Sequence, residues 1–394
     1  MTHQLLVAGG GMGGLATAIA AARAGWQSRV FEQAGAFSEA GAGLQLGPNA
    51  TRRLQAWGLG PDLQRDGAFP AWLRVRSAGD GQQLAAMQLG EDFVRRYGAP
   101  YVTLHRADLH GMLRVHAQAA GAQLQLGTRI VSVAQGANGV VLGTDHSARL
   151  EGAALAGADG LWSVVRSQVW PGAPAPQSTG HLAYRALLKQ QDLPAHLRSG
   201  DVTIWLGPRL HAVTYPVRQG HWLNAVVIVQ GLAPGSAQDW DLPAGGADLM
   251  RALDAAEACS SLKDLARAAP AWRLWVLHEL PPVADAGAMA RGRVALVGDA
   301  AHPMRPYFAQ GAGMAIEDAD ELGRCLAPVQ GGAGELPAAL LRYATSRWER
   351  NARVQRRSAR NGRIFHATGP LRRGRDLALK VLGERLLDSS WLYR

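Results

Sequence analysis

Three glycines near the N-terminus have the spacing that brings a backbone against a diphosphate. Gly9, Gly11 and Gly14 form G-x-G-x-x-G, in which the first glycine permits a tight turn, the second permits close approach to a pyrophosphate and the third permits close helix packing. Glu32 follows Gly14 by 18 residues, and its carboxylate can accept hydrogen bonds from an adenosine ribose. The alternative is a glycine-rich loop in an ordinary βαβ unit, because the chain contains 48 glycines.

The elements around these glycines favour the dinucleotide interpretation. Residues 5–8 form a short apolar run typical of a buried strand, residues 15–24 predict a helix of small apolar residues, and residues 28–31 predict a second strand that ends on Glu32. A diphosphate held by the loop would lie at the positive N-terminal end of the helix.

Length and composition limit the possible number of domains and the possible location of the protein. The 394 residues, 47% of them hydrophobic, suffice for two or three domains with sizeable cores. No apolar run approaches the roughly 20 residues of a membrane helix, and two scattered cysteines fit a reducing compartment, so we expect a cytoplasmic protein without a membrane partner.

The net charge of +10 comes mainly from arginine, and many arginines fall within 342–375. Arg353, Arg356, Arg357 and Arg360 recur at helical spacing, which favours a solvated helix face over a nucleic-acid surface. A positive field also favours anionic ligands.

Hydrophobic patterning changes along the chain. Residues 50–57 and 104–120 predict helices, 72–89 a hairpin, and 123–126, 130–133 and 140–144 strands. From about residue 176, strand-like stretches at 181–188, 202–206, 211–217 and 222–229 lie between glycine and proline turns without alternating helices, which predicts a mostly antiparallel sheet. Residues 246–269 predict a helical segment, 293–297 a buried strand, 311–326 a helix, and the remainder a mostly helical region.

Three short motifs follow one another in the chain. The first is the glycine motif with Glu32, the second is A-D-G-L-W-S-V-V-R at 158–166, and the third is G-D-A-A-H-P at 298–303, followed by Q-G-A-G at 310–313. In this order they resemble, over essentially the whole chain, the single-component FAD-dependent aromatic hydroxylases of the para-hydroxybenzoate hydroxylase-like group. W-L-G-P at 205–208, followed by His211 and Y-P at 215–216, resembles the branch acting on salicylate, 3-hydroxybenzoate or 6-hydroxynicotinate.

The resemblance implies an α/β fold: a Rossmann-like FAD-binding domain with an inserted, mostly antiparallel β-sheet substrate domain and C-terminal helices. FAD-binding segments are expected at 1–72, 101–175 and 281–330, substrate-domain segments at 73–100 and 176–280, and a helical region at 331–394.

The resemblance also implies bound FAD, NADH or NADPH as a transient co-substrate, and O2. In that chemistry a C4a-hydroperoxyflavin hydroxylates a small anionic aromatic acid. We expect no metal and no nucleic-acid partner, and a monomer or homodimer. The alternative on the same fold is a tailoring monooxygenase or epoxidase for a larger aromatic or polycyclic substrate.

The motifs assign cofactor contacts by resemblance. Asp299 would accept hydrogen bonds from ribityl hydroxyls, Arg106 would lie near the diphosphate and the flavin edge, and the helix starting near Gly311 would direct N–H groups at the flavin. Arg166 would hold the Asp159 loop together, although Asp159 could instead only form a turn and Arg106 could lie at the surface. The predicted cofactor-binding residues are Gly9, Gly11, Met12, Gly13, Gly14, Glu32, Gln33, Gly43, Arg106, Ile130, Asp159, Gly160, Gly298, Asp299, Pro306, Gly311, Ala312 and Gly313.

The implied reaction needs a base, because a phenolate is a better nucleophile than a phenol. His211 and Tyr215 are the predicted catalytic pair, since residues four apart on a strand share one face and histidine titrates near pH 6.5. A pair of half-buried sheet residues is the alternative. His302 is a third catalytic candidate, with fixing of the adjacent turn as its alternative role.

Five further residues have weaker assignments. Gln45 and Tyr307 are predicted substrate contacts. Arg185 could pair with a substrate carboxylate or with a surface acid. Glu317 and Asp318, next to each other in a predicted helix, are expected to be structural rather than an acid–base pair.

Overall fold

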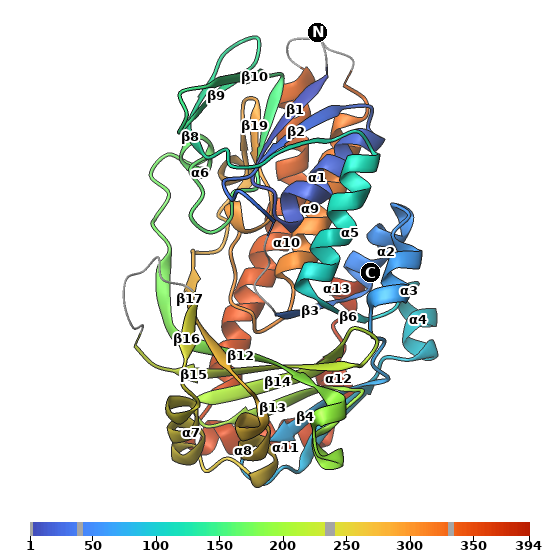
Figure 1. Ribbon diagram of the computed structural model, residues 1–394, viewed down its shortest axis with the longest axis vertical. Helices are drawn as coiled ribbons and strands as arrows, with labels where there is room; N and C mark the ends of the chain where they lie inside the picture. The colour runs from blue at the N-terminus through green and yellow to red at the C-terminus, as the bar shows by residue number, and fades with distance from the viewer. Residues whose placement is uncertain (1–2, 38–41, 233–240, 330–334) are drawn as a thin grey trace.

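The computed structural model describes residues 3–37, 42–232, 241–329 and 335–394. Figure 1 shows a parallel sheet at one end of the molecule, a large antiparallel sheet at the other, and the long helix α10 (Glu335–Phe365) running from one to the other. None of the helices in the described ranges is both long and apolar enough to cross a membrane.

The first sheet carries the glycine motif. Its order is β18-β19-β11-β1-β2-β7, and every pairing is parallel except that of β18 with β19. The strands are β1 (Gln4–Ala8), β2 (Gln27–Phe31), β7 (Gln123–Gln125), β11 (Ala154–Gly157), β18 (Ala290–Arg291) and β19 (Val294–Leu296).

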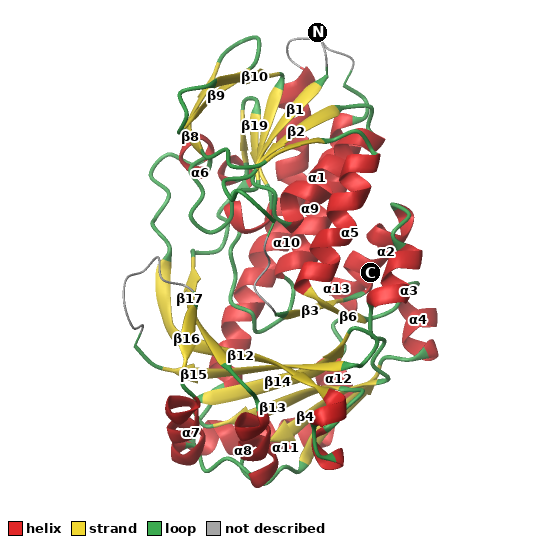
Figure 2. Ribbon diagram, viewed as in Figure 1, coloured by secondary structure: helices red, strands yellow, loops and turns green. Residues whose placement is uncertain are grey.

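Both faces of this sheet are covered, which explains the continuous apolar run of β1. Figure 2 shows α1 (Met12–Arg23), α5 (Arg106–Ala119) and α9 (Gly311–Leu326) gathered on one side. A smaller antiparallel sheet of β8 (Ile130–Gln135), β9 (Val140–Thr144) and β10 (Arg149–Gly152) contacts β1 from the other side. Leu5, Leu6 and Val7 are therefore fully buried.

The second sheet has eight strands in the order β16-β17-β12-β15-β14-β13-β4-β5, antiparallel except where β13 pairs with β4. The strands are β4 (Trp72–Ser77), β5 (Gln83–Gln88), β12 (Gln177–Lys189), β13 (Val202–Gly207), β14 (Leu210–Val217), β15 (Trp222–Gln230), β16 (Leu242–Ala244) and β17 (Trp272–Glu279). One face packs on α7 (Gly246–Ala255) and α8 (Ser260–Ala268), through residues such as Leu249 and Leu262. The opposite face is turned toward the first sheet.

Shorter elements connect the two sheets. β3 (Gly43–Leu46) pairs with β6 (Val102–His105), and the chain between them forms α2 (Pro48–Ala56), α3 (Gly60–Asp66) and α4 (Glu91–Tyr97), with β4 and β5. The other helices are α6 (Arg166–Val169), α11 (Gly369–Leu382), α12 (Glu384–Leu387) and α13 (Ser390–Tyr393).

Two predicted helix boundaries differ from the structure. The helix expected over 104–120 begins only at Arg106, because Leu104 and His105 pair with β3 as the end of β6. The helical segment expected over 246–269 is two helices. Glu257 has φ +52° between them, and the backbone N–H of Cys259 donates to the carbonyl of Ala78 instead of continuing a helix.

Candidate active site

The glycine loop has the geometry of a diphosphate cradle. Gly9 has φ +101°, and a Cβ there would lie 2.3 Å from the carbonyl oxygen of Ala158. A Cβ on Gly14 would lie 1.9 Å from the carbonyl oxygen of Gly9. Gly11 is different, because among the described residues no atom outside its own chain neighbours and helix backbone lies within 4 Å of the position of its Cβ. Internal packing therefore does not require glycine at this position, whereas close approach of a ligand diphosphate does.

Glu32, at the end of β2, closes the loop from the side. Its Oε2 accepts from the backbone N–H of Gly10 at 2.8 Å, and its Oε1 accepts from that of Ala34 at 2.9 Å. Its backbone carbonyl accepts from Thr128 at 2.8 Å, which brings the segment leading to Ile130 alongside. Ile130 itself is buried in the core at the start of β8. The expected adenosine end thus has an acid at a strand terminus beside an apolar wall.

The loops after β11 and β19 are bound to each other. Arg166 donates from Nε to the carbonyl of Ala300 at 2.8 Å and from its terminal nitrogen to that of Leu161 at 2.9 Å. The carboxylate of Asp159 accepts from Ser163 Oγ at 2.5 Å and from the N–H of Val164 at 2.8 Å. Arg166 therefore holds the D-G and G-D motifs together, and Asp159 shapes its own turn, as the alternative interpretation of that residue expected.

Asp299 has a carboxylate that is available to a ligand. The residue is exposed and, among the described residues, its side chain has no hydrogen-bond partner. Surrounding protein nevertheless desolvates it and raises its pKa, an effect that His302 and Arg106 oppose. An acceptor in such a position fits the hydroxyls of a ribityl chain. Arg106 begins α5, where its backbone N–H donates to Ala42 at 2.7 Å.

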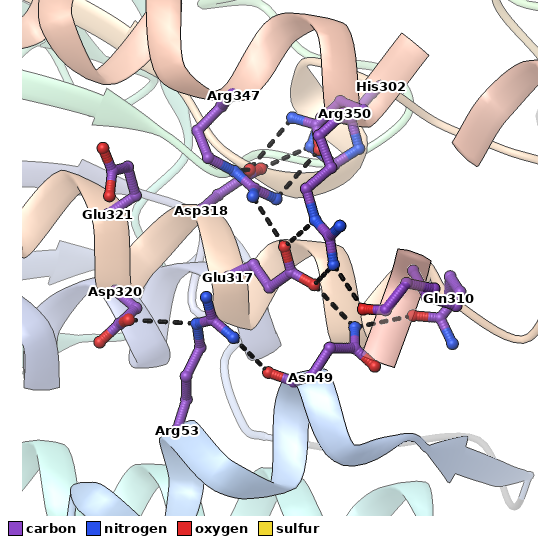
Figure 3. A network of polar contacts seen from close by, with 12 residues as sticks. Asn49, Arg53, His302, Gln310, Glu317, Asp318, Asp320, Glu321, Arg347 and Arg350 are labelled. Atoms are coloured by element: carbon purple, nitrogen blue, oxygen red, sulfur yellow. Dashed lines mark hydrogen bonds and ion pairs between the residues drawn. The ribbon is translucent and has the colours of Figure 1, made fainter. Parts of the chain in front are cut away.

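The N-terminus of α9 is fixed by a buried polar network (Figure 3). Asn49 of α2 donates from Nδ2 to Gln310 Oε1 at 3.0 Å and to Glu317 Oε1 at 2.7 Å. Arg347 of α10 reaches Glu317 Oε2 at 2.7 Å and Asp318 Oδ1 at 2.8 Å. Arg350 also pairs with Glu317, at 2.6 Å. The two acids have a structural role, as expected from the sequence.

His302 belongs to this network rather than to an open site. Its side chain is completely enclosed, and Nε2 contacts Asp318 Oδ2 at 2.5 Å. Asp318 Oδ2 also accepts from the N–H of Gly298 at 3.1 Å, which ties the G-D motif to α9. This geometry favours the structural role of His302 over a catalytic one.

His211 lies on the face of the large sheet that is turned toward the first sheet. It is 1% exposed, and its Nδ1 lies 2.8 Å from Nε2 of His366, which follows the end of α10. Tyr307 and His181 form a second pair, with the phenol oxygen 2.5 Å from Nδ1 of His181. The rings of His211 and Tyr307 are 5.0 Å apart. Burial, together with the neighbouring histidines His366 and His181, holds the pKa of His211 well below its usual value.

Tyr215 follows His211 on the same face and meets residues from β3 and β6. Tyr101 donates to Gln45 Oε1 at 2.7 Å, and the Tyr215 phenol lies next to the side chains of Gln45 and Asn224. Burial raises the pKa of Tyr215, so this phenol stays protonated. Position 43 needs a glycine, because a Cβ there would lie only 2.5 Å from the Tyr215 ring. The structure thus brings Gln45 and Tyr215 together, and their roles toward a substrate stay predictions.

The remaining assigned residues line the loops already described. Met12 and Gly13 begin α1, Gln33 follows Glu32 at the surface, Gly160 and Gly298 have positive φ in the D-G and G-D loops, Pro306 lies beside Tyr307, and Gly311, Ala312 and Gly313 form the first turn of α9. The sequence did not single out His181, His366, Tyr101 or Asn224. For His181 a signal existed, since it lies four residues before Arg185 on one strand. His366 carried no such signal, because only the tertiary fold brings the end of α10 to β14.

A surface groove of about 770 Å³ lies elsewhere, beside α3, α5 and the turn between β14 and β15. Its charges are largely paired, as Arg218 with Asp108 and Arg65 with Asp62. We do not assign it to the reaction.

The chain matches a family model described as "FAD binding domain" over residues 2–358. A 3-hydroxybenzoate 6-hydroxylase from Polaromonas naphthalenivorans (strain CJ2) is 37% identical over 392 residues, covering 99% of this chain and 95% of the relative. A 6-hydroxynicotinate 3-monooxygenase from Bordetella bronchiseptica (strain ATCC BAA-588 / NCTC 13252 / RB50) is 36% identical over 368 residues, covering 91% of each.

Solved structures agree with these relatives. A salicylate hydroxylase substrate complex superposes with a TM-score of 0.83 at 27% identity, covering 100% of this chain and 95% of that one. The fold class and the FAD cofactor predicted from the sequence are confirmed. The chain therefore belongs to the family of FAD-dependent aromatic monooxygenases that is built on this FAD-binding domain.

Proposed function

We propose that this protein hydroxylates a small hydroxylated aromatic acid of the hydroxybenzoate or hydroxynicotinate type, consuming NADH or NADPH and O2. The names of the two relatives above support this substrate class. The observation that carries the proposal is the contact of His211 with His366, on the sheet face that also presents Tyr215.

Bound FAD supplies the redox chemistry, taking electrons from the nicotinamide and activating O2. Asp299, the open side of Gly11 and the first turn of α9 would hold the cofactor. The protein's own task is to orient the ring, exclude water and remove the phenolic proton.

His211 is suited to remove that proton. Its lowered pKa keeps the imidazole neutral at pH 7. With the proton on Nδ1 and donated to His366 Nε2, His211 offers the lone pair of Nε2 to a substrate hydroxyl. Tyr215, protonated and next to Gln45 and Asn224, can donate a hydrogen bond to the same substrate.

The test is product formation with a panel of 3-hydroxybenzoate, salicylate, 4-hydroxybenzoate and 6-hydroxynicotinate. At least one acid should give a hydroxylated product, which must be scored directly because uncoupled turnover also consumes NADH. His211→Ala should retain FAD and lose about 100-fold or more of product formation. His221→Ala is the matched control, since His221 is exposed in the turn after β14. Full hydroxylation by the His211 variant would contradict its role as the base.

A further inference from the structure

Arg185 lies in the middle of the sheet face that carries His211 and Tyr215. On β12 its neighbours Tyr184 and Ala186 point into the core on the other side of the sheet, so Arg185 points toward the site. The register places Arg185 opposite Val226 of β15, which pairs in turn with Val213 of β14. Val213 lies between His211 and Tyr215 on its strand. Arg185 therefore shares the middle row of this face.

This row of Arg185, Val226 and Val213 is partly exposed at its two ends. Arg185 and Val213 are half-buried, whereas Val226 between them is buried, as are His211 and Tyr215. The rows of His211 and Tyr215 lie on either side of this strip. The strip ends, on the β12 side, at the guanidinium of Arg185.

The guanidinium is held by an aromatic ring rather than by an acid. Its central carbon lies 3.7 Å from the centroid of the Trp275 ring, a cation–π contact. The indole N–H of Trp275 donates to Asp241 Oδ1 at 2.8 Å, which fixes the ring. Asp241 in turn pairs with Arg273 through both carboxylate oxygens, at 2.6 and 2.7 Å. The nearby carboxylate is thus already bound to another arginine.

Arg185 lacks a counter-ion of its own. Within the described ranges it forms no ion pair and no hydrogen bond, and its Nε is buried without a partner. Burial and the nearby Arg106 lower its pKa to about 10, which still leaves it charged at pH 7. Other buried arginines differ: Arg347 meets two carboxylates and Arg166 four carbonyl groups. An unpaired cation whose Nε is buried is costly unless a ligand supplies the anion.

We propose that Arg185 is the anion-binding residue of the substrate site and takes the carboxylate of the aromatic acid. The aromatic ring would lie along the strip. Its carboxylate would accept hydrogen bonds from the guanidinium N–H groups of Arg185, and its hydroxyl would lie near His211. Two strand spacings separate β12 from β14, about 10 Å, a span that an arginine and a single-ring acid can bridge. This assignment rests on the proposed function, and it names what that function alone does not: the residue that selects an acid over a neutral phenol.

The test compares ligands with and without the negative charge. FAD-loaded wild type, Arg185→Gln and Arg185→Lys are titrated by calorimetry with 3-hydroxybenzoate, benzoate and neutral 3-hydroxybenzamide. Arg185→Gln should bind the two acids about 50-fold or more weaker and change amide binding less than about 3-fold. Arg185→Lys should keep part of the affinity, because it keeps the charge but not the fork of donors.

Arg267→Gln is the matched control, since Arg267 is exposed on α8, which packs on the opposite face of the sheet, and pairs there with Asp264. It should leave acid binding within about 3-fold of wild type. Unchanged FAD content shows that the Arg185 variants fold. Equal loss for acid and amide, or acid binding unaffected by Arg185→Gln, would overturn the anion site. If benzoate binding depends on Arg185 but no acid is hydroxylated, the anion site stands and the proposed reaction fails; if a neutral phenol is hydroxylated as well as its acid, the reaction stands and the anion site fails.

Discussion

At the scale of single residues, the site is a set of histidines kept neutral by their neighbours. Burial lowers the pKa of all three histidines. Arg305 adds to the effect on His181, and His366 and His181 add to the effect on His211. The pKa of His366 falls to about 3, because His181, Arg375 and Arg305 add to its burial. Each pair, His211 with His366 and His181 with Tyr307, uses one ring nitrogen for a fixed partner. The fixed partner orients each ring, and in the tautomer that we propose for His211 the nitrogen away from His366 would be the one offered to a substrate.

His366 should therefore act as a positioning residue for His211. His366→Asn should lower kcat about 10- to 100-fold with little change in KM, because the base is misoriented while the anion site is intact. The acidic limb of the kcat profile should move to higher pH, since the nearby His366 contributes to the low pKa of His211. Steady-state rates of product formation from pH 5 to 9 measure both effects. A fall in kcat with an unmoved pH profile would indicate a merely structural role.

Residue types and strand periodicity allowed part of this site to be predicted. His211 and Tyr215 share a face because side chains alternate along a strand. The assignment of Asp299 and Arg106 to the cofactor rests on the motif order and stays a prediction. The contact of His366 with His211 could not be predicted. The two residues are 155 positions apart in the sequence, and only the packing of α10 on the sheet brings them together. The role of His302 stayed open for the same reason, since Asp318 reaches it from another element.

At the scale of elements, the network of Figure 3 is what aligns the cofactor loops. Glu317 and Asp318 connect α9 to Asn49 of α2, to Arg347 of α10 and to the G-D loop. The pKa of Glu317 is lowered to about 2; burial raises it, but Arg347 and Arg350 outweigh that effect. The network thus fixes the first turn of α9 relative to the glycine loop.

Removing one cation from this network should destabilise the protein strongly. Arg347→Met should cost about 3 to 5 kcal/mol in the free energy of unfolding, because two fully enclosed carboxylates each lose the charged partner that they share. Arg324→Met is the control: its pair with Glu321 is at the surface, and its loss should cost less than about 1 kcal/mol. Urea unfolding of the FAD-loaded proteins gives the comparison, and equal costs for the two variants would contradict a structural role for the network.

The pairing of β3 with β6 is a feature that the local sequence pattern could not predict. Residues 104 and 105 suit a helix by periodicity, yet they extend β6 because Gly43 and Leu44 lie opposite them. Gly43 also meets Tyr215 of the large sheet. A pairing between residues some 60 positions apart therefore set both a helix boundary and one wall of the site, and no local signal contained it.

At the scale of the whole molecule, the interface between the two sheets makes stability depend on pH. His181, His211 and His366 take up protons in the unfolded chain below about pH 6.5 but resist them in the fold. The unfolded state then binds more protons, so stability should fall as pH drops below 6.5. Glu317, whose pKa is depressed, contributes stability that is present above about pH 4.5 and is lost below it.

As the pH falls from 6.5 to 5, each histidine that stays neutral in the folded state should lower the free energy of unfolding by up to about 2 kcal/mol. The midpoint of thermal unfolding should fall over this interval, and His366→Asn should fall less steeply than wild type. His221→Ala, which changes an exposed histidine, should follow the wild-type slope. If the unfolding midpoint changes with pH at the same slope in all three proteins, the buried histidines do not resist protonation in the folded state.

Transfer of one oxygen atom from O2 to a hydroxylated aromatic acid tests the central claim most directly. FAD-loaded protein is supplied with NADH or NADPH, isotopically labelled O2 and the acid of the panel that binds it most tightly. The mass of the product is then measured by mass spectrometry. We predict a ring-hydroxylated acid carrying one labelled oxygen, formed by wild type and nearly absent with His211→Ala. Consumption of NAD(P)H that yields only hydrogen peroxide with every acid of the panel would contradict the proposed function.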